Sequence, residues 1–224
     1  PWPCAGRLVT RISPLLPFAG KLEGMENNRL QQQIHFIVAI DQLKTVIRQS
    51  YLVTGERKEN TAEHSWHVAV AAMLLCEYAN EPVDRSRVVQ MLLLHDIVEI
   101  LAGDTYLYDS AGLSDQSARE QEAAQKLFGL LPTDQSQEFH QLWEEFESKS
   151  SPEARFAKSI DRLIPLLHNY ENHGKSWLEH GIQPKMVLER THSIAEGSAR
   201  LWELAQQIIQ DSAQKGYLKP APGA

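Results

Sequence analysis

The sequence places a histidine and an aspartate side by side in one of its most apolar stretches. His95 and Asp96 follow Met91-Leu92-Leu93-Leu94 and precede Ile97-Val98. Burying an ionised carboxylate alone costs on the order of several kcal/mol, so Asp96 requires a cation, a metal ion or several hydrogen bonds. Glu99 lies four residues after His95 and three after Asp96, a spacing that puts all three on one helix face. We therefore expect a polar site within the core, although an ordinary buried ion pair would account equally well for His95 and Asp96 alone.

Ionisable residues recur in two other segments with apolar neighbours. His64 opens the run Glu63-His64-Ser65-Trp66-His67-Val68-Ala69, and Asp161 lies in Phe156-Ala157-Lys158-Ser159-Ile160-Asp161-Arg162-Leu163-Ile164. His67 and His168 follow His64 and Asp161 by three and seven residues. We interpret these two as histidines that pack in the core or support the ligands from behind, rather than as ligands themselves.

A histidine, then a His-Asp doublet, then a distant aspartate is an order that resembles the HD-domain metal-dependent phosphohydrolase superfamily. Four blocks resemble its 5′-deoxynucleotidase-like branch: Glu59-Asn60-Thr61-Ala62-Glu63-His64-Ser65, His95-Asp96-Ile97-Val98-Glu99, Gly103-Asp104 and Ala157-Lys158-Ser159-Ile160-Asp161-Arg162. The resemblance spans roughly residues 30–171, with the motifs in the family's order.

The resemblance implies one divalent metal ion bound by His64, His95, Asp96 and Asp161. Two imidazoles and two carboxylates suit Mn²⁺, Co²⁺, Fe²⁺, Ni²⁺ or Zn²⁺, whereas Mg²⁺ prefers an all-oxygen shell. Glu99 and Asp104 match the family's catalytic acidic positions, and we expect one of them to manage the proton on the attacking water or on the leaving group. Asp104 follows Gly103, so a plain turn residue is the alternative for it.

Three basic residues are candidates for substrate binding: Arg48, Arg57 and Lys158. The family holds the substrate phosphate with an arginine at the end of the first helix, and Arg48 fits that place, although Gln49-Ser50-Tyr51 departs from the Arg-Trp of some relatives. Arg57 is as well explained as a solvated loop residue. Lys158 lies one helical turn before Asp161, and a surface ion pair with Glu153 or Asp161 is its alternative.

Apolar residues at helical spacing predict the elements that position these side chains. We expect an all-α, single-domain HD-type helical bundle with helices over about 28–49, 64–78, 86–101, 114–128, 135–147, 152–169 and 184–210. The domain would span 28–212, after a disordered or poorly structured extension over 1–27 and before a flexible tail over 213–224. Prolines interrupt the apolar patch near the N-terminus, which argues against a signal peptide, and we expect the natural start at Met25.

Composition restricts the class of substrate. A net charge of −7 argues against a protein that grips nucleic-acid polymers through their phosphates, and no apolar stretch is long enough to span a membrane. Two cysteines in unlike settings make a disulfide framework improbable, so we expect a cytoplasmic protein, and by family tendency a homodimer.

The leading interpretation is a phosphohydrolase that releases phosphate from (deoxy)nucleoside 5′-monophosphates by attack of metal-activated water. Two alternatives are an HD hydrolase of nucleoside triphosphates or cyclic phosphodiesters, and a non-catalytic regulatory module that binds metal or nucleotide.

Overall fold

The computed structural model describes residues 28–220, and the structural statements below refer to this part of the chain. The expectations for residues 1–27, including the poorly structured extension and the start at Met25, lie outside the described residues, as does the end of the tail over 221–224.

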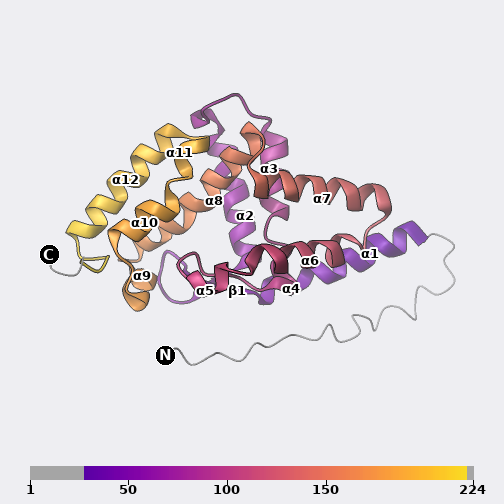
Figure 1. Ribbon diagram of the computed structural model, residues 1–224, viewed down its shortest axis with the longest axis horizontal. Helices are drawn as coiled ribbons and strands as arrows, with labels where there is room; N and C mark the ends of the chain where they lie inside the picture. The colour runs from indigo at the N-terminus through magenta and orange to yellow at the C-terminus, as the bar shows by residue number, and fades with distance from the viewer. Residues whose placement is uncertain (1–27, 221–224) are drawn as a thin grey trace.

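Helices dominate the described chain, and two short strands form a hairpin (Figure 1). The elements are α1 (Asn28–Ile40), the 3-10 helix η2 (Asp41–Thr45), β1 (Ile47–Tyr51), β2 (Lys58–Asn60), α2 (Thr61–Leu75), the 3-10 helix η3 (Cys76–Tyr78), α3 (Arg85–Leu94), α4 (Glu99–Ala102), α5 (Ser110–Leu113), α6 (Gln116–Phe128), α7 (Thr133–Ser148), α8 (Pro152–Glu171), α9 (Lys175–His180), α10 (Pro184–Thr191), α11 (Ile194–Gly197) and α12 (Ala199–Gln214). The predicted all-α bundle is confirmed, with the hairpin as an addition.

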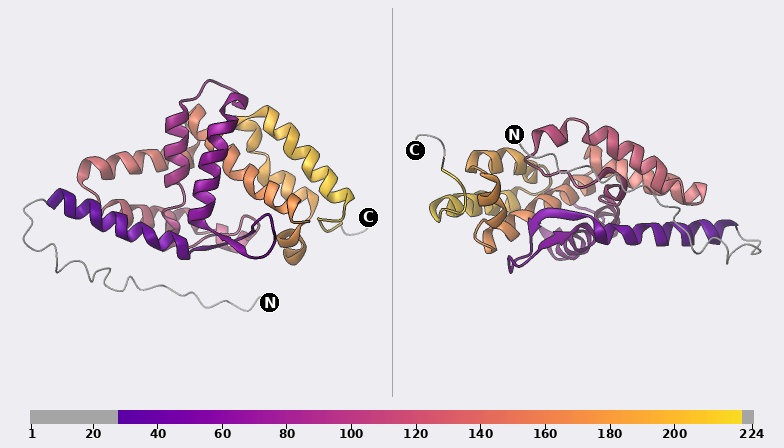
Figure 2. Two further views of the ribbon diagram at one scale, coloured as in Figure 1. Left: turned by 180° about the vertical axis from the view of Figure 1, so that it is seen from behind. Right: turned by 90° about the horizontal axis from the view of Figure 1, so that it is seen from below.

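Helix α8 lies in the middle of the bundle and contacts α2, α3, α7, α11 and α12. Both faces of the molecule show α1, α6 and α7 extending to one side of the α2–α3 pair, with α9 to α12 on the other side (Figures 1 and 2). Two buried apolar clusters follow this division, one around Val68, Leu92 and Ile160 and the other around Phe36 and Phe128. Leu94 packs against both clusters, so the His-Asp pair that follows it lies where they meet.

The first predicted helix ends early. Instead of continuing to residue 49, α1 stops at Ile40 and the chain enters β1, which pairs antiparallel with β2 through the partners Ile47 with Asn60 and Tyr51 with Lys58. Helical periodicity up to Ile47 concealed the break, whereas the β-branched and aromatic residues around Arg48 favour an extended backbone once a partner strand is present. Gly55 lies between the two strands and has the positive φ of 70° that a glycine adopts without strain.

The predicted helix over 86–101 is also interrupted. Helix α3 ends at Leu94, and the next residues form tight turns in which Ile97 N donates to Leu94 O and Glu99 N donates to Asp96 O, before α4 begins at Glu99. Bonds between residues three apart wind the chain more tightly than an α-helix does. The turns therefore change the directions of His95, Asp96 and Glu99 relative to those of a straight helix.

The C-terminal region contains more breaks than its periodicity predicts. The single helix expected over 184–210 is divided into α10, α11 and α12, and α9 precedes it without having been predicted. A Cβ on Gly197 would lie 2.3 Å from Arg155 O, so only glycine allows α11 to approach α8 this closely. Part of the segment expected as a flexible tail is packed, because Leu218 is buried and Lys219 N donates to Ile182 O.

Over the described residues, no helix combines the length and apolar character needed to cross a membrane.

Candidate metal centre

Three helices deliver the four predicted metal ligands. His64 lies in the first turn of α2, whose start is fixed by a capping box in which Asn60 Oδ1 accepts from Glu63 N and Glu63 Oε2 accepts from Asn60 N. His95 and Asp96 lie at the end of α3, and Asp161 lies within α8. The four residues are called the HD group below.

The donor atoms of the HD group converge. His64 Nε2 is 3.0 Å from Asp161 Oδ1, and His95 Nε2 is 3.6 Å from the same oxygen. His95 Nε2 is also 3.1 Å from Asp96 Oδ1, while His64 Nε2 is 3.9 Å from Asp96 Oδ2. One donor atom from each of His64, His95 and Asp96 falls within 4.8 Å of the others. The structure thus brings together the four side chains that the motifs nominate.

The histidine tautomers fit a bound cation. His95 Nδ1 is 2.8 Å from Leu92 O, so this nitrogen carries the proton and His95 Nε2 turns its lone pair towards the two carboxylates. His95 Nε2 is buried and has no hydrogen-bond partner. A lone pair that faces carboxylate oxygens needs a positive charge between them, so a divalent cation fits this donor set.

Electrostatics support the same conclusion. Burial lowers the pKa of His95, but the carboxylates of Asp96 and Asp161 outweigh it and raise this pKa to about 10. A second proton, on Nε2, is thus the alternative to a cation as the positive charge between the ring and the carboxylates. Burial raises the pKa of Asp96, yet His95 and Arg48 hold it below its usual range. The pKa of Asp161 is likewise held well below its usual value, against burial, by Arg162 and by the two histidines. The group therefore consists of two ionised carboxylates that require positive charge beside them.

Arg48 reaches the HD group from β1 rather than from the end of the first helix. Its Nη1 donates a 2.8 Å hydrogen bond to Asp96 Oδ2 and lies 3.8 Å from Asp104 Oδ1 and 4.0 Å from Glu99 Oε1. Burial lowers the pKa of Arg48, but these carboxylates raise it overall, so the guanidinium stays charged. Among the described residues, Arg48 Nε has no hydrogen-bond partner and lies 3.8 Å from Glu59 Oε2, so the guanidinium makes one hydrogen bond to a side chain, through Nη1.

Glu99 and Asp104, the predicted catalytic acids, both lie beside Arg48. Thr61 Oγ1 donates a 2.9 Å hydrogen bond to Glu99 Oε2, which ties this carboxyl to the first residue of α2. Burial and the nearby carboxylates of Asp96 and Asp104 raise the pKa of Glu99 well above its usual value. Burial also raises the pKa of Asp104, in spite of Arg48. Asp104 is thus partly buried at the site rather than a plain exposed turn residue.

The other two predicted substrate-binding residues differ in position. Arg57 is exposed and forms a two-pronged ion pair with Glu63 at 2.7 and 2.9 Å, which supports the alternative of a loop residue outside the site. Lys158 lines the cleft. Its ammonium forms an ion pair with Glu147 Oε1 at 3.1 Å, whereas the sequence suggested Glu153 or Asp161 as the partner. The same ammonium lies 4.1 Å from the centre of the Phe146 ring.

The site lies in a polar cleft, and a second cavity adjoins this cleft. Asp96, Glu99, Asp161 and Lys158 line the cleft. The adjoining cavity is lined by side chains that include Tyr106, Tyr108 and Trp177. The two hollows share the following residues: Arg48, Asp104, Thr105, Leu107 and Arg162. A ligand could therefore place a charged group in the cleft and an aromatic group in the cavity.

Sequence reasoning did not assign roles to three residues that the structure brings to the site. Arg162 lines both hollows, Thr61 holds Glu99, and buried Glu59 has its Oε2 3.5 Å from His64 Nδ1. All three belong to motif blocks that resemble the family, which is the signal that could have nominated them. Their functions depend on distances that spacing alone does not give.

Known proteins resemble this chain in sequence and in fold. The HD domain family matches residues 40–202. A predicted metal-dependent phosphohydrolase from Magnetospirillum magnetotacticum MS-1, known from its crystal structure, is 48% identical with a TM-score of 0.82, over 86% of this chain and 97% of that one. The 5′-deoxynucleotidase HDDC2 of Bos taurus is 31% identical over 68% of this chain and 74% of its own length. The 5′-deoxynucleotidase HDDC2 of Homo sapiens is 32% identical over 62% of this chain and 67% of its own length.

These matches confirm the resemblance that the motif blocks carry. The family match contains every residue of the HD group together with Arg48, Glu99 and Asp104. From its motifs, its fold and its relatives, the chain belongs to the HD domain family, in the metal-dependent phosphohydrolase branch that resembles 5′-deoxynucleotidases.

Proposed function

We propose that this chain hydrolyses (deoxy)nucleoside 5′-monophosphates to nucleoside and inorganic phosphate. One observation carries the proposal: His95, Asp96 and Asp161 of the HD group line one cleft together with Arg48, Glu99 and Asp104, and this cleft adjoins a cavity with aromatic walls. A purely structural metal site would not need acidic side chains beside it or an open cleft. The names of the HDDC2 relatives support the same substrate class.

His64, His95, Asp96 and Asp161 hold the metal ion in this proposal, and their nitrogen and oxygen donors favour Mn²⁺, Co²⁺, Fe²⁺, Ni²⁺ or Zn²⁺. When bound, such an ion lowers the pKa of a coordinated water and polarises a phosphoryl oxygen. Leu92 O supports the ligand geometry, because it accepts from His95 Nδ1 and so keeps Nε2 free to bind.

The substrate phosphate is bound by Arg48, whose guanidinium presents five N–H donors and gives one hydrogen bond to Asp96. Arg162 and Lys158 line the same cleft and add positive charge. These cations offset the acidic side chains around them, so that a phosphate dianion can enter a protein with a net charge of −7.

Glu99 and Asp104 move the protons of the reaction. The oxygen of water attacks phosphorus, the bond between phosphorus and the 5′ oxygen breaks, one proton leaves the water and one proton reaches the departing oxygen. Thr61 keeps the Glu99 carboxyl oriented while the proton moves. Burial, together with the neighbouring carboxylates, raises the pKa of both carboxyls, which favours the protonated form that a proton donor needs.

The nucleoside occupies the adjoining cavity, where Tyr106, Tyr108 and Trp177 offer aromatic surface to a base. A triphosphate carries more phosphate charge than a monophosphate, and a cyclic dinucleotide needs room for a second nucleoside, whereas the described cleft offers Arg48, Arg162 and Lys158 as cations and adjoins one aromatic cavity. The monophosphate therefore fits the available cations best.

The deciding experiment measures phosphate release from deoxy- and ribonucleoside 5′-monophosphates, nucleoside triphosphates and cyclic dinucleotides with Mn²⁺, Co²⁺ or Mg²⁺. We expect turnover of monophosphates that disappears in Asp96→Asn. Preferential turnover of a triphosphate or cyclic dinucleotide would replace the proposed substrate. Metal binding at full occupancy without turnover of any substrate would indicate a regulatory module.

We also propose that the chain forms a homodimer. Support comes from an apolar strip on the outer face of α2, where Trp66, Met73 and Leu74 are 64%, 51% and 70% exposed. Light scattering on the purified chain should give twice the chain mass, and the double variant Trp66→Ser, Leu74→Ser should give the monomer mass. A wild-type monomer mass would contradict this assignment.

A further inference from the structure

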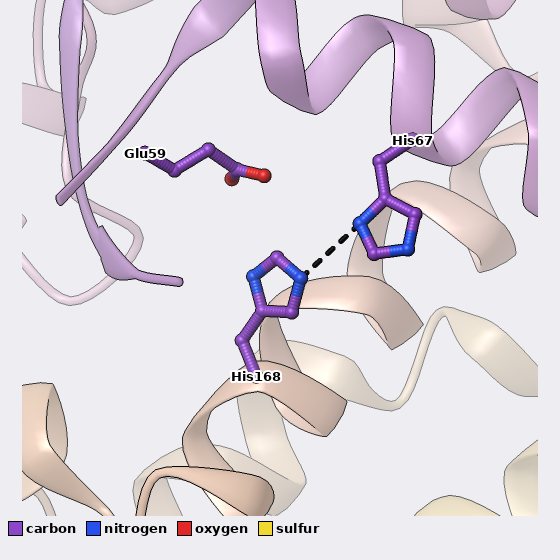
Figure 3. A group of neighbouring side chains, drawn as sticks. All are labelled: Glu59, His67 and His168. Carbon is purple, nitrogen blue, oxygen red and sulfur yellow. Dashed lines mark hydrogen bonds between the residues drawn. The ribbon is translucent and has the colours of Figure 1, made fainter. Parts of the chain in front are cut away.

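A second group of metal-binding side chains lies beside the HD group. Glu59 of β2, His67 of α2 and His168 of α8 come together, although they are far apart in the sequence, and Figure 3 shows the two rings and the carboxylate turned towards one another. One donor atom from each side chain lies within 4.8 Å of the other two. We call these residues the Glu59 group.

Two of the three side chains are deeply buried. Glu59 is 1% exposed and His168 is 3% exposed, while His67 is half-buried and opens the group towards solvent. Glu59 Oε2 has no hydrogen-bond partner in the described part of the protein; its nearest charged neighbours, His64 Nδ1 and Arg48 Nε, are 3.5 and 3.8 Å away. A buried carboxylate oxygen with such long contacts is incompletely satisfied.

The two imidazoles of the Glu59 group face each other through nitrogen. His168 Nε2 is 3.2 Å from His67 Nδ1, so a proton on one nitrogen must lie between them (Figure 3). This hydrogen bond satisfies one nitrogen of each ring and leaves Glu59 outside it. A cation in place of the proton would contact both nitrogens and the carboxylate together.

We propose that Glu59, His67 and His168 bind a second divalent transition-metal ion. Two imidazoles and one carboxylate form a donor set typical of Zn²⁺, Co²⁺ or Fe²⁺, with remaining positions for water. The site is distinct from the HD group because the two share no ligand. They are connected through Glu59, whose second function is to face His64 Nδ1 behind the first site. His67 and His168 are thus ligands, and not only the supporting histidines that sequence reasoning suggested.

The test is the number of Co²⁺ ions bound by the full chain after its metals are removed with a chelator. Equilibrium dialysis with elemental analysis, at free Co²⁺ that just saturates the wild type, should give two ions per chain. His67→Gln should retain one ion, with the affinity of the second site at least about 100-fold weaker, because one of three ligands is lost. Asp96→Asn should lose the other ion, and its visible Co²⁺ spectrum should differ from that of His67→Gln.

His192→Gln is the matched control, because it makes the same substitution at an exposed histidine outside both groups. It should bind two ions. Thermal melts check that each variant folds. One ion per chain in the wild type, with His67→Gln unchanged, would overturn the proposal.

Anomalous diffraction from Co²⁺-soaked crystals of the unaltered protein tests the site without any variant. Two peaks are expected, one within the HD group and one within the Glu59 group. A single peak in the HD group would reject the second site while leaving the proposed function intact. Two peaks in a protein that releases no phosphate from any substrate would support the second site and reject the proposed function.

Discussion

The HD group and the Glu59 group both combine histidines with carboxylates and share helices α2 and α8, yet their charges differ. The HD group combines two histidines with two ionised carboxylates, which raise the pKa of His95 to about 10. The Glu59 group has two histidines and one carboxylate, and burial lowers the pKa of His168. The comparison indicates that the number of carboxylates beside a pair of histidines decides how strongly a bound cation stabilises the cluster. The first group should therefore bind metal more tightly and be the one that supports hydrolysis.

The sharpest test of this comparison is Asp96→Asn. Replacing a charged ligand by a neutral side chain of nearly equal size should reduce kcat/KM for a nucleoside monophosphate by about 10³-fold or more, because the electrostatic stabilisation at phosphorus is lost. His67→Gln should change kcat/KM by less than about tenfold. Initial rates at saturating Mn²⁺ measure both, and equal losses in the two variants would remove the distinction between the groups.

The next largest effect is expected for Glu99→Gln, which keeps the hydrogen-bond acceptor for Thr61 but cannot transfer a proton. We expect kcat to fall by about 10²- to 10³-fold with little change in KM, as for the loss of a general acid or base. Steady-state kinetics from about pH 5 to about pH 9 supply the check. A normal kcat would exclude Glu99 from proton transfer and leave Asp104 in that function.

Arg48→Lys tests the phosphate contact. Lysine keeps the charge but loses the planar fork of donors, so KM should rise roughly 10- to 100-fold while kcat changes less. Arg57→Lys is the matched control, since Arg57 pairs with Glu63 on the exposed loop, and it should behave as the wild type. If Arg57→Lys raised KM as much as Arg48→Lys, the loop would have to contact the substrate.

Glu59→Gln tests the connection between the two groups. Without the carboxylate charge behind His64, metal affinity at the HD group should fall about tenfold, as is usual when the partner of a ligating histidine is changed. The Glu59 group should lose its own ion in the same variant. Calorimetric titration with Co²⁺ measures both, and an unchanged first site would mean that Glu59 serves the second group alone.

The smallest effect is expected far from both groups, at the ion pair between Arg29 of α1 and Asp134 of α7, where Arg29 Nη1 is 2.7 Å from Asp134 Oδ1. The hydrogen bond from Arg29 lowers the pKa of Asp134 from 3.8 to about 2. A lowered carboxyl pKa stabilises the fold above the unfolded value, and this stabilisation is lost as the pH falls through the folded value. At about pH 6, where the carboxylate is ionised, Asp134→Asn should therefore melt at a slightly lower temperature than the wild type. At about pH 2 the two should melt at nearly the same temperature, with activity unchanged. A gap in melting temperature that widens as the pH falls would contradict this sign.

The four residues of the HD group could be nominated from sequence because they are ionisable residues in segments that are otherwise apolar and because they match the motifs of the family. Apolar residues at helical spacing predicted α8, and the hydroxyl of Ser151 caps its start by accepting from Ala154 N. The hairpin was missed, since β1 is stabilised by its pairing with β2 and not by its own periodicity. The turns after Leu94 were missed for a similar reason: apolar residues continue through them without a proline or glycine.

The sequence by itself determined the family, the helical class and the residue types of the HD group, because motifs and buried charges are local properties of the chain. Only the tertiary structure decided that Arg48 reaches Asp96 from a strand, that Arg57 pairs with Glu63, and that Lys158 pairs with Glu147. It also brought Glu59, His67 and His168 together from three elements. Distances between residues remote in the chain depend on how the helices pack, and side-chain spacing within one helix carries no information about that packing.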